Sequence, residues 1–326
     1  MTSYTQSVLI TGGTSGLGYH CALEIARQHP EYRVIIACRS DPYQVTKEMN
    51  TLLHQTNVTW IQLDLSSLET VRNFAAQWES HKYPPIQSLV CNAALQFPGA
   101  AEYTVDGYEK TFAISHIGHA LLFSLLRPYL ADKARVVIVS SGVHYAEQKT
   151  GMPKPNYISA EELAHPPASI SNATGRLHYC NTKLANVLYM YALHRRFLSI
   201  NEKNGKHWTV TAFDPGLMPG TGLARHGSTV EQFLWNRVLP HAFPVLKALI
   251  SPNIHTAKDS GASLARLAVG EDVDGVSGRY FEGRREVESS KASFDKGHQE
   301  DLWGWTLKIM ARNEDEKRNM SLSDLL

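Results

Sequence analysis

A tyrosine and a lysine four residues apart are the residues of this chain best suited to acid–base chemistry. Tyr179 and Lys183 open an apolar run with helical periodicity over residues 184–197. Positions i and i+4 share one face of a helix, so the phenol and the ammonium are expected to be neighbours. The positive charge favours the phenolate and lowers the pKa of the phenol. Such a pair can give a proton to a carbonyl or take one from an alcohol.

A glycine-rich turn near the start of the chain has the setting of a dinucleotide phosphate site. It spans residues 11–18, between a short apolar strand at 8–10 and a segment with helical periodicity. Glycine lets the backbone approach a pyrophosphate, and the first turn of a helix offers unpaired N–H groups. A turn without a ligand is the alternative. The residues expected to bind the phosphates are Gly12, Thr14, Ser15, Gly16, Leu17 and Gly18.

The end of the second expected strand, at residues 33–37, indicates which cofactor is bound. In NAD-binding sheets an acidic residue about 20 positions beyond the glycine turn holds the ribose 2′-hydroxyl, whereas an arginine suits a 2′-phosphate. Arg39 stands at that distance from Gly18, and no acid occupies the strand end. NADP(H) is therefore favoured, and a solvated surface arginine is the alternative.

Four further strands are expected at residues 59–63, 88–91, 135–139 and 208–213. Strands that alternate with helices predict a parallel sheet, and ligands bind beyond the carboxyl ends of such strands. Asp64 would either cap the next helix or hydrogen-bond the adenine. Ser141 follows the third of these strands as a catalytic candidate. The residues expected to bind the cofactor beyond the other three strands are Asp64, Leu65, Asn92, Ala93, Pro215, Gly216 and Thr221.

The expected architecture is one α/β domain over residues 1–326, a Rossmann-type doubly wound parallel sheet with helices on both faces. Two stretches fall outside this sheet. Residues 142–176 form a long connection expected to be a loop on the substrate side. Residues 217–256 form an apolar, lid-like segment that could cover an apolar substrate, make a subunit contact in a homo-oligomer, or rest peripherally on a membrane surface.

Composition excludes several functions. The chain has 326 residues and a net charge of +1 without a basic run, which argues against a nucleic-acid partner. Its four cysteines lack CxxC spacing, and His116 and His119 lack a carboxylate partner, so free thiols and no metal site are expected. No apolar run reaches the roughly 18 residues of a spanning helix, and the first strand begins too early for a signal peptide. The expected location is the cytoplasm.

In this order, the glycine turn, Asn92-Ala93-Ala94, Ser141, Tyr179-xxx-Lys183 and Pro215-Gly216 resemble the motifs of the short-chain dehydrogenase/reductase family. The resemblance covers about residues 7–225. Four shorter stretches look most like the branch of the retinol dehydrogenases and light-dependent protochlorophyllide reductases: Cys38-Arg39, Leu63-Asp64-Leu65, Gly118-His119 and the region from Ser289 to Phe294.

The resemblance implies a hydride transfer between nicotinamide C4 and a substrate carbon. It makes Tyr179 the general acid or base and gives Lys183 two tasks, lowering the pKa of the tyrosine and holding the nicotinamide ribose. Ser141 would hydrogen-bond the reacting oxygen. This agrees with the chemistry of the residues, because donors fixed in advance around one oxygen stabilise the charge that develops on it.

The chain departs from the family at two positions. Family members carry an asparagine where this chain has Ser115, a further catalytic candidate. That asparagine bends its helix and positions a water of the proton relay, so the relay is in doubt here. Protochlorophyllide reductases have a cysteine directly after the Pro-Gly pair, whereas this chain has Leu217. Their photochemistry is therefore not expected.

The sequence thus predicts an NADP(H)-dependent reductase or dehydrogenase that acts on a bulky, mostly apolar carbonyl or alcohol, with secondary metabolites among the candidates. Two alternatives stay open. The same hydride donor and tyrosine would serve an enzyme that reduces an activated C=C bond. A nucleotide-binding protein that has lost turnover is the other alternative, which the serine at position 115 would permit.

Overall fold

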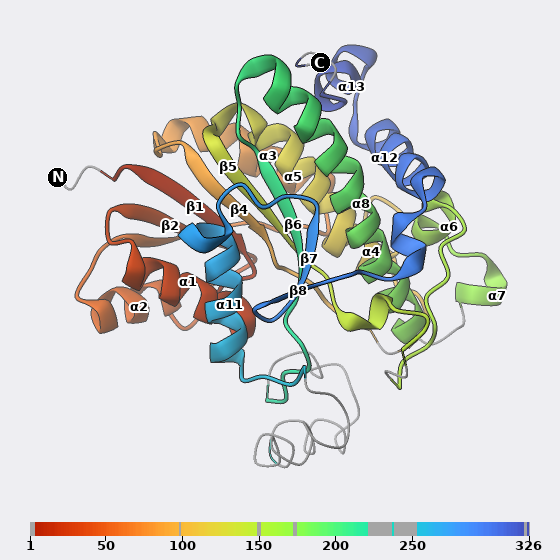
Figure 1. Ribbon diagram of the computed structural model, residues 1–326, viewed down its shortest axis with the longest axis horizontal. Coiled ribbons are helices and arrows are strands. Elements are labelled where there is room, and N and C mark those ends of the chain that lie inside the picture. Colours follow the sequence, from red (N-terminus) through yellow and green to blue (C-terminus); the bar gives the residue numbers. More distant parts are fainter. Residues whose placement is uncertain are drawn as a thin grey trace.

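The computed structural model describes residues 4–97, 99–148, 151–171, 175–220, 237, 253–322 and 325. These residues form a sheet of eight strands in the order β3-β2-β1-β4-β5-β6-β7-β8, drawn in Figure 1. All neighbours pair in parallel except β7 and β8. The strands are β1 (Gln6–Thr11), β2 (Tyr32–Cys38), β3 (Val58–Gln62), β4 (Ile86–Cys91), β5 (Leu130–Val139), β6 (Thr209–Asp214), β7 (Arg279–Glu282) and β8 (Arg285–Val287).

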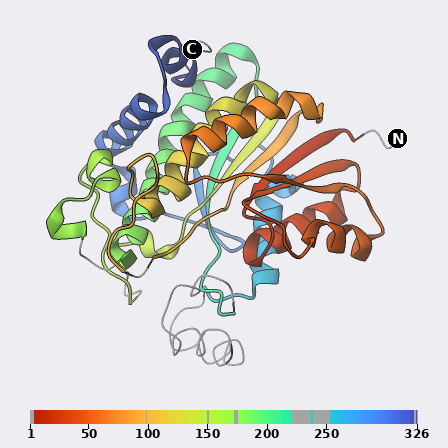
Figure 2. The ribbon, with the colours of Figure 1, turned by 180° about the vertical axis from the view of Figure 1, so that it is seen from behind.

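Helices cover both faces of the sheet. One face carries α1 (Gly16–Gln28), α2 (Val45–Leu53) and α11 (Ala257–Val269), whose apolar residues share a core with β1 and β2. Figure 2 shows the opposite face, where α3 (Leu68–Trp78), α5 (Gly118–Leu126), α8 (Gly175–Asn204) and α12 (Lys296–Met310) lie. The central strands are apolar almost throughout because both of their sides are buried. The doubly wound α/β architecture predicted from the sequence is confirmed.

The helical segment over residues 110–126 contains an irregular turn. It consists of α4 (Lys110–Phe112), a π-helical turn (Ala113–Ile117) and α5. Glu109 caps its start, because its carboxylate accepts hydrogen bonds from the N–H groups of Thr111 and Phe112. π turns are rare and occur often at functional sites. This one holds Ser115.

The long connection after β5 includes two short helices, α6 (Ala160–Ala164) and α7 (Ala168–Ser171). The segment around α6 is fixed to α12 by Asp301, whose Oδ2 accepts hydrogen bonds from the Tyr157 hydroxyl at 2.7 Å and the Ala160 N–H at 2.8 Å. Of the apolar segment at 217–256, only residues 217–220, 237 and 253–256 are described. The prediction of a lid there lies almost entirely outside the described residues.

The C-terminal part was not expected from the sequence. Strands β7 and β8 extend the sheet beyond β6, and α12 packs beside α8 as Figure 1 shows. The last described helix, α13 (Glu314–Met320), is held to α3 because Arg72 pairs with Glu316. Among the described residues, no helix combines the length and the hydropathy needed to cross a membrane.

Candidate active site

The tyrosine and the lysine lie on α8, beside the carboxyl end of β5. The Lys183 ammonium donates to the carbonyl of Val139, the last residue of β5, at 3.0 Å. The amide of Asn186 donates to the same carbonyl at 3.1 Å, and the Ser140 hydroxyl donates to the backbone carbonyl of Lys183 at 2.8 Å. Helix and strand end are thus held together by three bonds, and Lys183 Nζ lies 5.4 Å from the centroid of the Tyr179 ring.

The phenol of Tyr179 is buried, and this reverses the expected direction of its pKa. Burial raises the pKa well above its ordinary value, the negative charge of Asp214 raises it further, and a hydrogen bond with Ser141 opposes these effects. The sequence-based expectation of a lowered pKa is therefore not met. Burial is the main cause, and the ammonium that was expected to lower the pKa is held at the Val139 carbonyl.

Lys183 is an ammonium almost without solvent contact. Burial lowers its pKa to about 8, and the nearby carboxylate of Asp214 opposes this shift. The group therefore stays protonated at neutral pH. Buried ionisable groups with perturbed pKa values are typical of functional sites, which makes this pair a candidate for proton transfer.

Ser141 follows β5 and begins a single 3₁₀ turn (Gly142–His144). Its carbonyl accepts a hydrogen bond from the buried ring of His144, whose Nδ1 lies 2.8 Å away. The other ring nitrogen of His144 accepts the Ser290 N–H at 3.0 Å, so the neutral histidine carries its proton on Nδ1. The serine turn is thereby fixed to the C-terminal part of the chain, and the Ser141 hydroxyl is kept beside Tyr179.

The glycine turn forms a tight cradle at the start of α1. Gly12 and Gly16 have φ values of +68° and +56°, which favour glycine. A Cβ on Gly18 would lie 2.5 Å from the Gly12 carbonyl oxygen and 2.6 Å from the Asn92 amide nitrogen. Ser15 is the N-cap residue of α1, but its side chain makes no capping hydrogen bond. The first N–H groups of this helix therefore point to a space where an anion is favourable.

Thr11, Asn92 and His119 hold the cradle together. The Thr11 hydroxyl accepts hydrogen bonds from the N–H groups of Asn92 at 2.9 Å and Ala93 at 3.0 Å. The Asn92 amide donates to the Thr11 carbonyl at 2.7 Å. His119 Nε2 lies 2.8 Å from the same hydroxyl, and its Nδ1 lies 3.2 Å from the carbonyl of Ser115. His119 is thus a hydrogen-bonded core residue, and the described residues contain no cluster of His, Cys, Asp and Glu side chains that could hold a metal ion.

Ser115 lies in the π turn with its hydroxyl buried. That oxygen has no hydrogen-bond partner among the described residues, and the Ser115 carbonyl contacts His119. The helix is therefore irregular at this position, although the residue is a serine. Gly118, the residue after the π turn, packs against Leu65, because a Cβ there would lie 2.7 Å from the Leu65 carbonyl oxygen.

The remaining predicted residues lie at the same edge of the sheet. Arg39 is exposed directly after β2 and forms no hydrogen bond or ion pair within the described residues. Asp64 follows β3, where its Oδ1 accepts the Ser66 N–H at 2.9 Å. Gly216 has a φ of +74° and follows β6. Its neighbour Pro215 accepts the Ser260 hydroxyl at 2.7 Å. The remaining candidate, Thr221, lies outside the described residues.

Sequence reasoning missed Asp214 as a site residue. It is 3% exposed, and burial raises the pKa of its carboxyl to about 6. Its charge acts on both Tyr179 and Lys183. The available signal was an acid at the end of the otherwise uncharged strand Trp208–Phe213, directly before the Pro-Gly pair.

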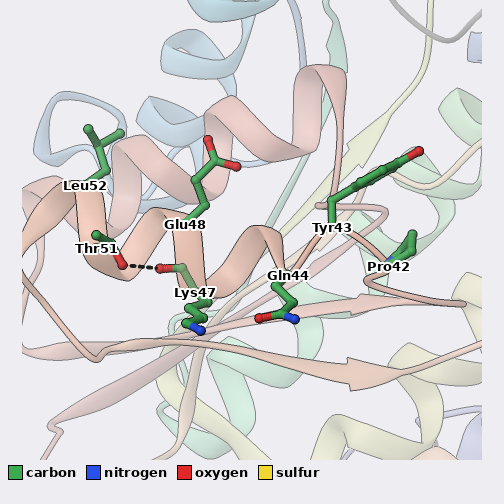
Figure 3. A pocket seen from close by; sticks show the side chains of 7 residues that line it. All are labelled: Pro42, Tyr43, Gln44, Lys47, Glu48, Thr51 and Leu52. Atoms are coloured by element: carbon green, nitrogen blue, oxygen red, sulfur yellow. Dashed lines mark hydrogen bonds between the residues drawn. The ribbon is translucent and has the colours of Figure 1, made fainter.

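A surface hollow of about 610 Å³ lies elsewhere, on α2 and the loop before it. Figure 3 shows its lining residues, where the Thr51 hydroxyl donates to the Lys47 carbonyl at 2.9 Å and Tyr43 extends away from the helix. Tyr43 is 85% exposed. The hollow contains none of the residues predicted to act.

Comparison with known proteins identifies the family of this chain. The family model described as short chain dehydrogenase matches residues 6–157. The human polyprenol dehydrogenase is 28% identical over 90% of this chain and 82% of its own length. The chloroplastic protochlorophyllide reductase of Daucus carota is 32% identical over 84% of this chain and 69% of its own. Human retinol dehydrogenase 13 is 29% identical over 97% of this chain and 88% of its own.

Solved structures share the fold. An uncharacterised protein of Mycobacterium paratuberculosis superimposes with a TM-score of 0.65 at 25% identity, covering 95% of this chain and 94% of its own. A 3-oxoacyl-[acyl-carrier protein] reductase of Brucella melitensis in complex with NAD gives a TM-score of 0.61 at 17% identity, covering 85% and 94%. The chain therefore belongs to the short-chain dehydrogenase/reductase family of oxidoreductases, in the branch of the retinol dehydrogenases and protochlorophyllide reductases.

Proposed function

We propose that this oxidoreductase uses NADP(H) to reduce the carbonyl, or to oxidise the alcohol, of a bulky and mostly apolar substrate. The observation that carries the proposal is the arrangement at the end of β5. There Ser141, Tyr179 and Lys183 converge, and the Lys183 ammonium is bonded to the Val139 carbonyl. The edge that holds them also holds the glycine cradle.

The residues of the cradle fit a nicotinamide dinucleotide. The N-terminus of α1 has no side-chain cap and offers its N–H groups to the pyrophosphate. Gly12 and Gly18 lie close together and have no side chains, so the pyrophosphate can approach the backbone of the turn. Arg39 is exposed and unpaired within the described residues, so its guanidinium is free to pair with a 2′-phosphate. When bound, the cofactor supplies or accepts the hydride.

Tyr179 is the residue that would donate the proton. Burial raises the pKa of the phenol, so the group is protonated at neutral pH and has a proton to give in carbonyl reduction, although the raised pKa makes it a weaker acid than an exposed tyrosine. The Ser141 hydroxyl, which bonds to the phenol, would donate a second hydrogen bond to the same substrate oxygen. Two fixed donors around one oxygen stabilise the negative charge that develops on it. Lys183 adds a positive charge to this environment.

The names of relatives and the composition of one segment support an apolar substrate. The names of two relatives give polyprenol and retinol as substrates, which are long, apolar alcohols. Residues 217–256 of this chain are rich in apolar side chains. An apolar substrate would bury such surface favourably.

The test is steady-state oxidation of NADPH and of NADH with all-trans-retinal, farnesal and 2-undecanone. Chromatography of the products should show the corresponding alcohols with their C=C bonds intact. Recovery of saturated aldehydes instead would identify a C=C reductase. Tight NADPH binding without oxidation of NADPH by any carbonyl would identify a nucleotide-binding protein without turnover. A higher kcat/KM with NADH than with NADPH would contradict the role of Arg39.

A further inference from the structure

Asp214 is a buried carboxylate to which the proposed reaction gives no role. Its Oδ1 accepts the Gly216 N–H at 2.9 Å, and its Oδ2 accepts the Asn253 side-chain amide at 2.7 Å. The N–H of Gly142 also stabilises the carboxylate, and a Cβ on Gly142 would lie 3.0 Å from Oδ2. One side chain thus joins the turn after Ser141 to the loop after β6.

The register of the sheet places this carboxylate near the lysine. Val139 of β5 pairs with Phe213 of β6, and the Ser140 N–H donates to the Phe213 carbonyl at 2.7 Å. The Val139 carbonyl holds the Lys183 ammonium, and Asp214 is the residue after Phe213. Lys183 forms no ion pair within 4.0 Å among the described residues, so the attraction between the two charges acts over a longer distance. In a buried site such an attraction is screened only weakly.

The other ionisable groups around this pair do not supply the same charge. His119, near Lys183, is neutral because burial lowers its pKa to about 4. Tyr145 and Tyr280 face Asp214 and are neutral because burial raises the pKa of each phenol. Glu282 lies on the neighbouring strand β7, but Arg285 pairs with it at 3.2 Å.

We propose that Asp214 is a positioning residue for proton transfer: its carboxylate ties the Ser141 turn to the Gly216 loop and keeps the buried Lys183 ammonium and Tyr179 phenol protonated. The proposal rests on the proposed function. The negative charge favours the ammonium over the neutral amine, and it disfavours the phenolate. Asp214 therefore raises the pH at which the Tyr179 phenol and the Lys183 ammonium lose their protons.

The kinetic test compares Asp214→Asn with wild type in the NADPH-dependent reduction of all-trans-retinal. Both proton losses become easier without the charge, so the alkaline limb of kcat/KM should move to lower pH by about one unit. The exchange variant Asp214→Asn/Asn253→Asp places the carboxylate at position 253, next to an amide at position 214. It should return the alkaline limb most of the way to its wild-type pH. Glu282→Gln, which removes a charge already paired with Arg285, should leave the limb in place.

An equal loss of kcat/KM at every pH, with the limb unmoved, would mean that Asp214 only supports the fold, and it would overturn the proposal. If Asp214→Asn does not fold, the exchange variant decides. A folded exchange variant with the wild-type limb supports the role of the charge, and a folded exchange variant whose limb lies at clearly lower pH contradicts it.

A second measurement does not depend on turnover. Thermal unfolding at pH 7.5 of Asp214→Asn, Lys183→Met and the double variant forms a double-mutant cycle. If the two charges attract, the melting temperature of the double variant should fall by less than the sum of the two single shifts. Additive shifts would overturn the proposal. Absence of turnover in wild type would overturn the proposed function alone, because the cycle would still report on the pair.

Discussion

The glycine cradle at residues 11–18 and the catalytic edge, defined as Ser141, Tyr179, Lys183 and Asp214, lie at the same end of the sheet but consist of different groups. The cradle offers backbone groups to a ligand. Close contacts limit which side chains it can accept, because a Cβ on Gly18 would lie 2.5 Å from the Gly12 carbonyl oxygen. The catalytic edge buries an amine, a phenol and a carboxyl, and burial shifts the pKa of each.

The difference separates two kinds of sensitivity. Backbone N–H groups do not titrate in the physiological range, so damage to the cradle should be sterically caused and independent of pH. The catalytic edge depends on charge states, so its failures should follow pH. Substitutions in the two regions can be distinguished by this criterion even where they reduce activity equally.

The largest effect is expected at the edge, from Tyr179→Phe. This change removes the proton donor and little else, so kcat should fall by about 10²- to 10⁴-fold while the Kd of NADPH stays nearly constant. Tyr191→Phe is the matched control on the same helix, because the Tyr191 hydroxyl bonds to Ser289 at 2.8 Å, away from the catalytic edge. Stopped-flow fluorescence and steady-state rates measure both quantities. A Tyr179→Phe enzyme as fast as wild type would show that the acid is another group.

The next effect concerns stability and pH at Asp214. Its carboxyl has a pKa of about 6 in the folded protein and near 3.8 when unfolded. Between these values the folded state binds more protons, so this group's contribution to stability falls as pH rises. The free energy of unfolding of wild type relative to Asp214→Asn should therefore drop by up to about 3 kcal/mol from pH 4 to pH 6.5. Urea unfolding at several pH values measures it, and parallel curves for the two proteins would refute it.

The cradle should respond differently in the same experiment. Gly18→Ala forces a Cβ against the Gly12 carbonyl and the Asn92 amide, so the free energy of unfolding should fall by about 1–3 kcal/mol. The loss should be equal at pH 4 and pH 6.5, and NADPH should bind more weakly. Gly304→Ala, on α12 with no neighbouring atom within 4 Å, is the control and should gain about 1 kcal/mol. A Gly18→Ala variant with wild-type stability and NADPH affinity would refute the steric account.

Local sequence patterns predicted most of the strands and helices that carry the candidate site residues. Apolar runs such as Val8–Ile10, followed by glycine and then by helical periodicity, give the order of strands and helices up to β6. They also place the cradle, Ser141 and the Tyr179 pair at one edge, because carboxyl ends of parallel strands share an edge. These features depend on residues close together in the chain, where periodicity is informative.

Such patterns could not predict contacts between residues far apart in the sequence. The bond of His119 to Thr11 joins residues 108 positions apart, and only the folded sheet brings them together. The direction of the pKa of Tyr179 depends on the depth of burial and on Asp214, neither of which has a spacing rule. The short strands β7 and β8 lack a long apolar run and are defined by pairing with β6 and with each other.

The smallest expected effect lies at the rim of the cradle, where a charge rather than the backbone would select the cofactor. Arg39→Asp removes a guanidinium that would pair with the 2′-phosphate and adds a carboxylate suited to a ribose 2′-hydroxyl. The ratio of kcat/KM for NADPH to that for NADH should fall by about tenfold or more. Arg27→Asp, on the last turn of α1 where Arg27 pairs with Glu24, is the control and should leave the ratio unchanged. An unchanged ratio in Arg39→Asp would mean that Arg39 is a solvated surface residue. The cradle would then bind only the pyrophosphate that NADH and NADPH have in common, and any preference for NADPH over NADH would arise elsewhere in the chain.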